Sequence, residues 1–385
     1  MNPRSQALLV GLALPAAALA ADESCPAQDV WPGADWADRS DEAATSAADA
    51  ITAFEAYAFP ADLDWSDKKR RGVRTDGVVI LKDGQLVYER YDGGYDRDTP
   101  HLAWSVSKTF TNVLAGIAVH QGLLTEDDSL CQWIDGLPSE NCDITLAHAL
   151  EFSTGLDWLE SYEDASPTHS SVAAMLYGEG TGDMAAFVAS HPRAHEPGTA
   201  FMYSSGDTNL IAALAGKALQ PTYGEHWPWE VLFDRIGMEK TTFERDGAGN
   251  YVGSSWVWAP PRHLARLGWL LMNDGCWEGE RLVPEGWVAK SVTAGEGFRS
   301  LDLDANGYVN GRQIWLNTPV PEAGITERPW PDVPETAYSA LGVWKQAIFV
   351  APEQGVVVVR TGDDRDGTFD WNTFFSLALA LAEDA

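Results

Sequence analysis

Two stretches rich in β-branched and apolar residues, one near each end of the chain, predict β-hairpins. In the first, residues 77–91 form two such runs on either side of Asp83-Gly84, a pair that favours a tight turn. In the second, residues 346–350 and 355–360 flank a short Pro-Glu-Gln segment. Strands are therefore expected from both ends of the chain.

Other segments have apolar residues at helical spacing instead. They cover residues 42–57, 105–120, 146–152, 172–176, 208–219, 261–272 and 371–382. This order predicts an α+β fold, in which an antiparallel sheet is completed by both ends of the chain and flanked by helices, with a mostly helical region inserted. We expect an N-terminal extension over 21–74, a sheet domain formed by 75–104 and 250–385, and a mostly helical domain over 105–249.

The first 20 residues have a different pattern. Arg4 precedes an apolar run over 7–21, which ends in Ala18-Leu19-Ala20 before two acids. This layout is typical of a secretory signal peptide over 1–20. A membrane span needs about 20 apolar residues, so permanent anchoring is the less favoured interpretation. We expect a secreted or periplasmic protein with no integral membrane segment in its mature form.

Four cysteines in an exported chain predict two disulfides. Cys131 and Cys142 flank a turn-rich segment and are the easiest pair, which leaves Cys25 with Cys276. The sequence by itself permits three connectivities, and four buried free thiols are the alternative.

The charge and motif content exclude several function classes. With 57 acidic and 26 basic residues the net charge is −31, which repels nucleic acid and favours neutral or cationic substrates; a strongly solvated surface explains the same charge. No Cys-x-x-Cys or His-Glu-x-x-His is present, so we expect no metal. The glycine-rich segments 178–182 and 247–249 do not fit a dinucleotide fingerprint, and no cofactor is expected. The oligomeric state stays open.

Two segments match the pattern Ser-x-x-Lys. Ser66 and Lys69 lie among charged residues, where a lysine stays solvated and protonated. Ser105 and Lys108 instead begin an apolar helical segment. Residues three apart share a helix face, so the Lys108 amine can reach the Ser105 hydroxyl, and burial can lower its pKa enough to make it a base. The Ser105 amide at a helix start is one candidate oxyanion donor. The alternative is an N-capping serine with a surface lysine, and the local pattern does not decide between them.

From about Thr75 to its end, the chain resembles the serine β-lactamase and penicillin-binding-protein superfamily, which includes class C β-lactamases, D,D-peptidases, family VIII carboxylesterases and 6-aminohexanoate-oligomer hydrolases. The resemblance rests on four segments in the family's order: Trp104-Ser105-Val106-Ser107-Lys108, residues 144–156 with their Ser153-Thr154-Gly155-Leu156 turn, the Glu196-Pro197-Gly198 lead-in to Tyr203, and residues 232–238. It implies a β-lactamase/transpeptidase-like fold.

The resemblance also implies site roles. Tyr203 becomes the proton shuttle between serine, lysine and leaving group, with Ser205 in the polar position beside it. A neighbouring Lys108 ammonium is expected to lower the pKa of the Tyr203 phenol. Without the family, Tyr203 would be interpreted as an ordinary core aromatic.

The third motif departs from the pattern. Where relatives carry Lys-Thr-Gly or His-x-Gly, this chain has Ala340-Leu341-Gly342-Val343-Trp344-Lys345, which is similar to the Gly-x-x-Gly-Gln version of amide and ester hydrolases. The Val343 amide is the candidate second oxyanion donor, and Trp344 and Tyr162 are expected near the substrate. Lys345 either replaces the missing cation or is a solvated strand residue.

These residues predict an exported serine hydrolase that cleaves a small ester or linear amide through an acyl-Ser105 intermediate. A β-lactamase or D-amino-acid peptidase is the alternative within the same chemistry. A non-catalytic cell-wall-binding module of the same fold is the alternative outside it, and the intact Ser105, Lys108 and Tyr203 argue against that. No Gly-x-Ser-x-Gly is present to support an α/β-hydrolase triad.

Overall fold

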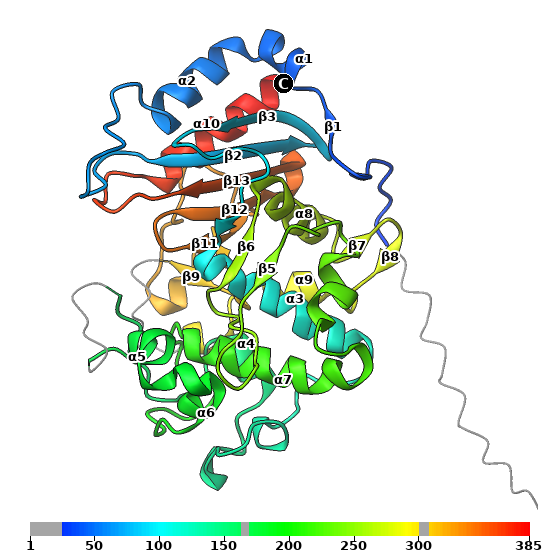
Figure 1. Ribbon diagram of the computed structural model, residues 1–385, viewed down its shortest axis with the longest axis vertical. Helices are drawn as coiled ribbons and strands as arrows, with labels where there is room; N and C mark the ends of the chain where they lie inside the picture. Colours follow the sequence, from blue (N-terminus) through cyan, green and yellow to red (C-terminus); the bar gives the residue numbers. More distant parts are fainter. Residues whose placement is uncertain (1–24, 163–168, 300–307) are drawn as a thin grey trace, which may run out of the picture.

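An eight-stranded sheet runs through the computed structural model of the protein, which describes residues 25–162, 169–299 and 308–385 (Figure 1). The predicted signal peptide over 1–20 lies outside the described residues. The strand order is β1-β3-β2-β13-β12-β11-β10-β9. The strands are β1 (Ala37–Asp38), β2 (Thr75–Lys82), β3 (Gln85–Tyr91), β9 (Val309–Asn310), β10 (Trp315–Leu316), β11 (Tyr338–Gly342), β12 (Gln346–Ala351) and β13 (Val356–Gly362).

The two predicted hairpins meet at the centre of this sheet. Strand β2 pairs antiparallel with β13, and Val79 lies opposite Val359. The α+β fold, with its sheet completed by both ends of the chain, is therefore confirmed. One edge strand departs from the antiparallel pattern, because β1 runs parallel to β3. Parallel neighbours need a long connection, and here it includes the helices α1 (Ser40–Ser46) and α2 (Ala48–Ala58) and the strand β2.

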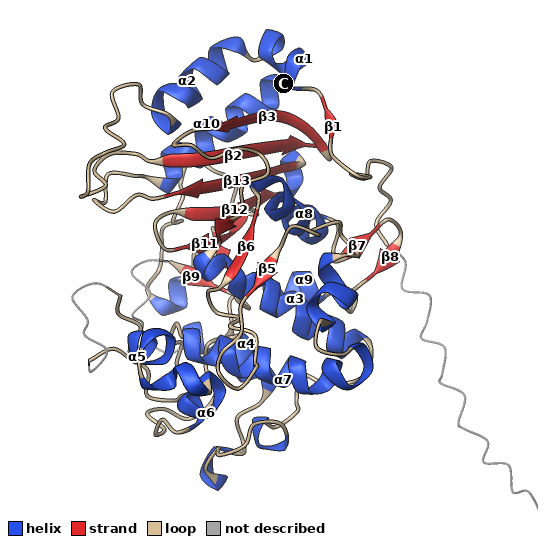
Figure 2. Ribbon diagram, in the orientation of Figure 1, coloured by secondary structure: helices blue, strands red, loops and turns tan. Residues whose placement is uncertain are grey.

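Alternating valines give the sheet two buried faces. In β13, Val356 and Val358 join one core, and Val357 and Val359 join the other. Helices α2 and α10 (Trp371–Asp384) cover the first face, and α8 (Pro261–Met272) covers the second (Figure 2). Gly268 of α8 permits this close packing, because a Cβ there would lie 2.5 Å from a Val357 methyl.

The remaining helices form a second region beside the sheet (Figure 1). They are α3 (Ser107–His120), α4 (Leu146–Leu150), α5 (Ser171–Tyr177), α6 (Met184–Ala189) and α7 (Ser205–Tyr223), with α9 (Trp287–Ser291) further along the chain. Short strands β4 (His101–Leu102), β5 (Thr242–Phe243) and β6 (Val257–Ala259) form a small sheet, and β7 (Cys276–Trp277) pairs with β8 (Glu280–Arg281). All residues of α3 from Ser107 to Ala118 are buried, so this helix lies in the core on every side.

Both predicted disulfides are confirmed. Cys131 is bonded to Cys142, and Cys25 to Cys276. The second bond attaches the start of the described chain to β7, and the first closes a loop of the helical region. Disulfides of this kind are typical of extracellular proteins. Within the described ranges no helix is long and apolar enough to cross a membrane.

Replacing both Cys131 and Cys142 by alanine is expected to lower the free energy of unfolding by about 3 kcal/mol, because a short crosslink removes conformations from the unfolded chain. Denaturant unfolding of the parent and the double variant measures this. The reduced parent loses both disulfides and should therefore unfold at a lower denaturant concentration than the double variant, which keeps the bond between Cys25 and Cys276. An unchanged unfolding midpoint would contradict a stabilising role for this bond.

Candidate active site

Ser105 lies in a tight turn between a strand and the buried helix α3. The Ala103 amide donates a hydrogen bond to the Val257 carbonyl at 2.8 Å, which extends the pairing of β4 with β6. Trp104 then adopts a positive φ of 49°, and the 3₁₀ turn η1 (Trp104–Val106) leads into α3 at Ser107. Ser105 therefore precedes the α-helix, whereas the sequence placed it in the first helical turn. The chain first changes direction after the strand, through Trp104 and the 3₁₀ turn, and the α-helix begins only after this turn.

Lys108 is enclosed by the core. Its side chain is 1% exposed, so it does not reach the surface. Its amine lies 3.1 Å from the Ser105 hydroxyl, 2.9 Å from the Ser205 hydroxyl and 3.0 Å from the Ser254 carbonyl. Burial lowers the pKa of Lys108 to about 8, and only the charge of Glu160 opposes this. By contrast, Ser66 and Lys69 of the other Ser-x-x-Lys are exposed, and the Ser66 hydroxyl donates to Asp64.

Ser205 connects Lys108 to a carboxylate that the sequence did not single out. The Ser205 hydroxyl donates to Glu160 Oε1 at 2.6 Å, and its backbone amide donates to Oε2 at 2.9 Å. The same carboxylate accepts hydrogen bonds from Trp158 Nε1 and from the Tyr162 hydroxyl. Four donors thus fix the position of the Glu160 carboxyl group beside Ser205. Its one sequence signal was an acid just after the Ser-Thr-Gly-Leu turn, which matches no motif by itself.

Tyr203 lies two residues before α7, against strand β10 of the sheet. Its ring stacks on Trp315 with centroids 5.1 Å apart and contacts Phe152 at 4.9 Å. The Lys108 amine lies 5.0 Å from the centre of the Tyr203 ring. The expectation of a lowered phenol pKa is wrong: burial, with the negative charge of Glu160, raises the pKa of Tyr203, although a hydrogen bond with Ser105 opposes them. The phenol therefore keeps its proton in the resting site.

A cavity of about 260 Å³ opens in front of these groups and is lined by Ser105, Tyr203, Val343 and others. Gly342 lets the end of β11 lie against the serine turn, because a Cβ there would be 2.6 Å from the Ala103 carbonyl oxygen. Neither the Ser105 amide nor the Val343 amide donates a hydrogen bond to a described residue. Two free N–H groups at the mouth of one cavity can receive an oxyanion.

The remaining predicted residues are divided between two cavities. Tyr162 lines the Ser105 cavity with a ring that is 37% exposed, and its hydroxyl lies 3.2 Å from the Ser205 hydroxyl. Trp344 lines a neighbouring cavity instead, where it contacts Trp104 edge to face at 5.1 Å and the Arg365 guanidinium at 3.7 Å. Lys345, left undecided by the sequence, lines the Ser105 cavity.

Groups of three or more histidine, cysteine, aspartate or glutamate side chains that could hold a metal ion are absent from the described residues. The groups that meet at the Ser105 cavity are a serine, an amine, a phenol and two backbone amides. Such a set suits transfer of an acyl group to the serine.

Comparison with known proteins agrees with this geometry. A model of the family described as beta-lactamase matches residues 15–371. The 6-aminohexanoate-dimer hydrolase of Paenarthrobacter ureafaciens is 24% identical over 293 residues, which cover 74% of this chain and 72% of that protein. Among solved structures, the penicillin binding protein of Bacillus halodurans matches with a TM-score of 0.60 and 14% identity over 85% of this chain and 98% of that one. EstCE1, a hydrolase with promiscuous acyltransferase activity, matches with a TM-score of 0.58 and 15% identity over 89% of this chain and 100% of that one.

The fold and the site define a serine hydrolase of the β-lactamase fold. The chain belongs to the beta-lactamase family, whose model matches nearly all of it. The two solved structures have the same fold as this chain. The matched relative from Paenarthrobacter ureafaciens is named as a hydrolase of the 6-aminohexanoate dimer.

The pH dependence of hydrolysis is expected to follow the titration of Lys108. A general base must be neutral in the free enzyme, and the pKa of Lys108 is about 8. If Lys108 has that role, kcat/KM for an activated ester should rise about tenfold per pH unit below this value and level off above it. In Glu160→Gln the carboxylate that raises this pKa is gone, and the rising limb should move to lower pH. Steady-state rates from pH 5 to 10 measure both profiles. A limb that stays in place in Glu160→Gln would contradict the coupling.

Proposed function

We propose that the protein is an exported serine hydrolase that cleaves a small ester or linear amide through an acyl-Ser105 intermediate. The observation that carries this proposal is the buried Lys108 amine, held 3.1 Å from the Ser105 hydroxyl. The relative named 6-aminohexanoate-dimer hydrolase supports the reaction class, and so does the structure of the same fold described as a hydrolase with promiscuous acyltransferase activity. Export is supported by the two disulfides.

In the acylation step, neutral Lys108 accepts the proton of Ser105 as the serine oxygen attacks the substrate carbonyl. The negative charge that develops on the carbonyl oxygen is received by the amides of Ser105 and Val343. Ser205 and Glu160 act through Lys108: they fix the position of its amine, and the charge of Glu160 limits how far burial lowers its pKa.

Departure of the leaving group requires a proton on its oxygen or nitrogen. Tyr203 is the donor, since its raised pKa keeps the phenol protonated until the leaving group takes the proton. The Lys108 ammonium then returns a proton to the Tyr203 oxygen. Water repeats the sequence in reverse on the acyl-enzyme and releases the acid, with Lys108 again accepting a proton.

The size of the cavity favours small or linear substrates. About 260 Å³ is below the roughly 300–1,000 Å³ of pockets that enclose drug-sized ligands. A β-lactamase or D-amino-acid peptidase is the alternative, and the presence of Lys345 in the cavity favours it, because a penicillin brings a carboxylate that needs a cation. A non-catalytic cell-wall-binding module has less support, since its ligand would not require a lowered lysine pKa.

A fluorophosphonate probe is expected to form its adduct on Ser105, because there alone among the described Ser-x-x-Lys pairs is the lysine buried. Peptide mapping of the labelled protein locates the adduct. Lys108→Arg keeps the charge and removes the base, so it should lose at least about a hundredfold in kcat. Ser66→Ala is the matched control and should label normally. Label on Ser66, or full activity in Lys108→Arg, would contradict the mechanism.

Short p-nitrophenyl esters are expected to be hydrolysed with a higher kcat/KM than nitrocefin, because an ester leaving group departs with little help and the cavity is small. Parallel assays on one preparation of the mature protein give the ratio. A ratio in favour of nitrocefin would promote the β-lactamase alternative over the esterase.

A further inference from the structure

The cavity in front of Ser105 contains a charge that the proposed chemistry does not use. Lys345 is the only charged side chain among the described residues that line it. The wall around it is mostly aromatic and aliphatic, with Tyr203, Tyr308, Trp315, Trp371, Leu341 and Val343. Lys108, the other amine nearby, is committed to Ser105, Ser205 and the Ser254 carbonyl.

The backbone aims Lys345 into this cavity. Trp344 and Lys345 form the turn between β11 and β12 with positive φ angles of 60° and 72°, a conformation that side chains other than glycine rarely adopt. The Arg360 guanidinium donates to the Lys345 carbonyl at 2.7 Å, and the side-chain Nε2 of Gln346 donates to the Val343 carbonyl at 3.1 Å. These hydrogen bonds fix the backbone of the turn from which the Lys345 side chain enters the cavity.

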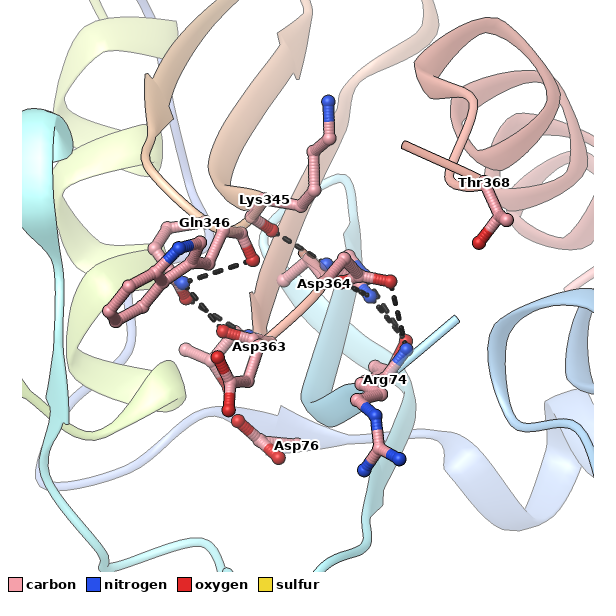
Figure 3. Close-up of polar contacts among 12 residues, drawn as sticks. Arg74, Asp76, Lys345, Gln346, Asp363, Asp364 and Thr368 are labelled. Carbon is pink, nitrogen blue, oxygen red and sulfur yellow. Dashed lines mark hydrogen bonds and ion pairs between the residues drawn. The ribbon is translucent and has the colours of Figure 1, made fainter. Parts of the chain in front are cut away.

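The acids closest to Lys345 are already paired. Asp364 is bonded to Arg360 at 2.6 Å and to the Arg74 amide at 2.8 Å, and Asp370 caps α10 through the Thr373 amide. Figure 3 shows the Lys345 ammonium pointing away from the carboxylates of Asp363 and Asp364.

The ammonium itself has no hydrogen bond or ion pair with any described residue. Its nearest recorded neighbour is the Trp371 ring, whose centre lies 5.8 Å away. Burial lowers the pKa of Lys345, and the charges of Asp364 and Asp370 only partly oppose this. The fold has already removed part of the Lys345 ammonium from water without giving it a partner. A carboxylate of a ligand can therefore bind it with little further desolvation of the ammonium.

We propose that Lys345 binds a carboxylate of the substrate, so that the natural substrate is an ester or amide with an apolar body and an anionic group, a role that rests on the acylation chemistry proposed for Ser105. The net charge of −31 repels anions from the protein surface as a whole. Lys345, in a cavity otherwise lined by neutral described side chains, attracts an anionic group of the substrate locally. Lys345 is then a specificity residue that does not take part in the proton transfers.

Two matched pairs of esters test this assignment. Mono-4-nitrophenyl adipate and 4-nitrophenyl hexanoate have acyl chains of equal length, and only the first ends in a carboxylate. The pair 3-acetoxybenzoate and phenyl acetate places the carboxylate on the leaving group instead. In Lys345→Met, the ratio of kcat/KM for the anionic to the neutral ester should fall at least about tenfold in one of the pairs. Lys345→Arg should keep that ratio within about threefold of the parent.

Lys217→Met is the matched control for the loss of one positive charge, because Lys217 pairs with Asp135 at 3.0 Å and lines a different groove. It should leave both ratios unchanged. If Lys345→Met hydrolyses the anionic and neutral members of both pairs in the parent ratio, the carboxylate site is wrong and the hydrolase is unaffected. A loss in the second pair alone assigns Lys345 to the leaving-group side.

A binding measurement separates this inference from the proposed function. In Ser105→Ala, which cannot be acylated, ligand-observed NMR should detect hexanoate binding more strongly than hexanamide, and Lys345→Met added to that variant should abolish the difference. Equal binding of both ligands in Ser105→Ala would overturn the carboxylate site. Preserved hexanoate preference in a protein that neither hydrolyses esters nor labels at Ser105 would instead reject the proposed function and keep the site.

Discussion

Burial of the Lys108 amine is the constraint on which the rest of the active site depends. An amine cannot be removed from water cheaply unless oxygen atoms replace its water partners. Here those atoms come from three separate segments: Ser105 from the turn before α3, Ser205 from the start of α7, and the Ser254 carbonyl from a loop. Satisfying one buried group therefore fixes three segments relative to one another.

The carboxylate of Glu160 completes this arrangement from a fourth segment. Its charge raises the pKa of both Lys108 and Tyr203, whereas burial lowers the pKa of Lys108 and raises that of Tyr203. Burial therefore separates the behaviour of the two groups, and Glu160 limits how far the pKa of Lys108 falls. A base that titrates near neutrality and a phenol that stays protonated can then have different roles within one small site. Four hydrogen bonds hold the Glu160 carboxyl group in this position.

The sheet supplies the opposite wall of the cavity. Its central strands are buried on both faces, which leaves β11 little freedom to shift against the serine turn. Gly342 allows the close approach, and the left-handed turn that follows sends Trp344 to one side and Lys345 to the other. One short turn thus provides both a candidate oxyanion amide and a cation for substrate selection.

The sequence by itself determined the features that depend on nearby residues. The Asp83-Gly84 pair and the valine runs determined the hairpins, helical periodicity gave α8 its boundaries, and the spacing of Ser105 and Lys108 placed their side chains within reach of each other. The spacing of Cys131 and Cys142 likewise predicted their bond. Only the tertiary structure decided the parallel edge strand β1, the entry of Glu160 into the site, the raised pKa of Tyr203 and the separation of Trp344 from Lys345. Each of these is set by burial and by contacts between segments far apart in the chain, and local pattern carries no information about either.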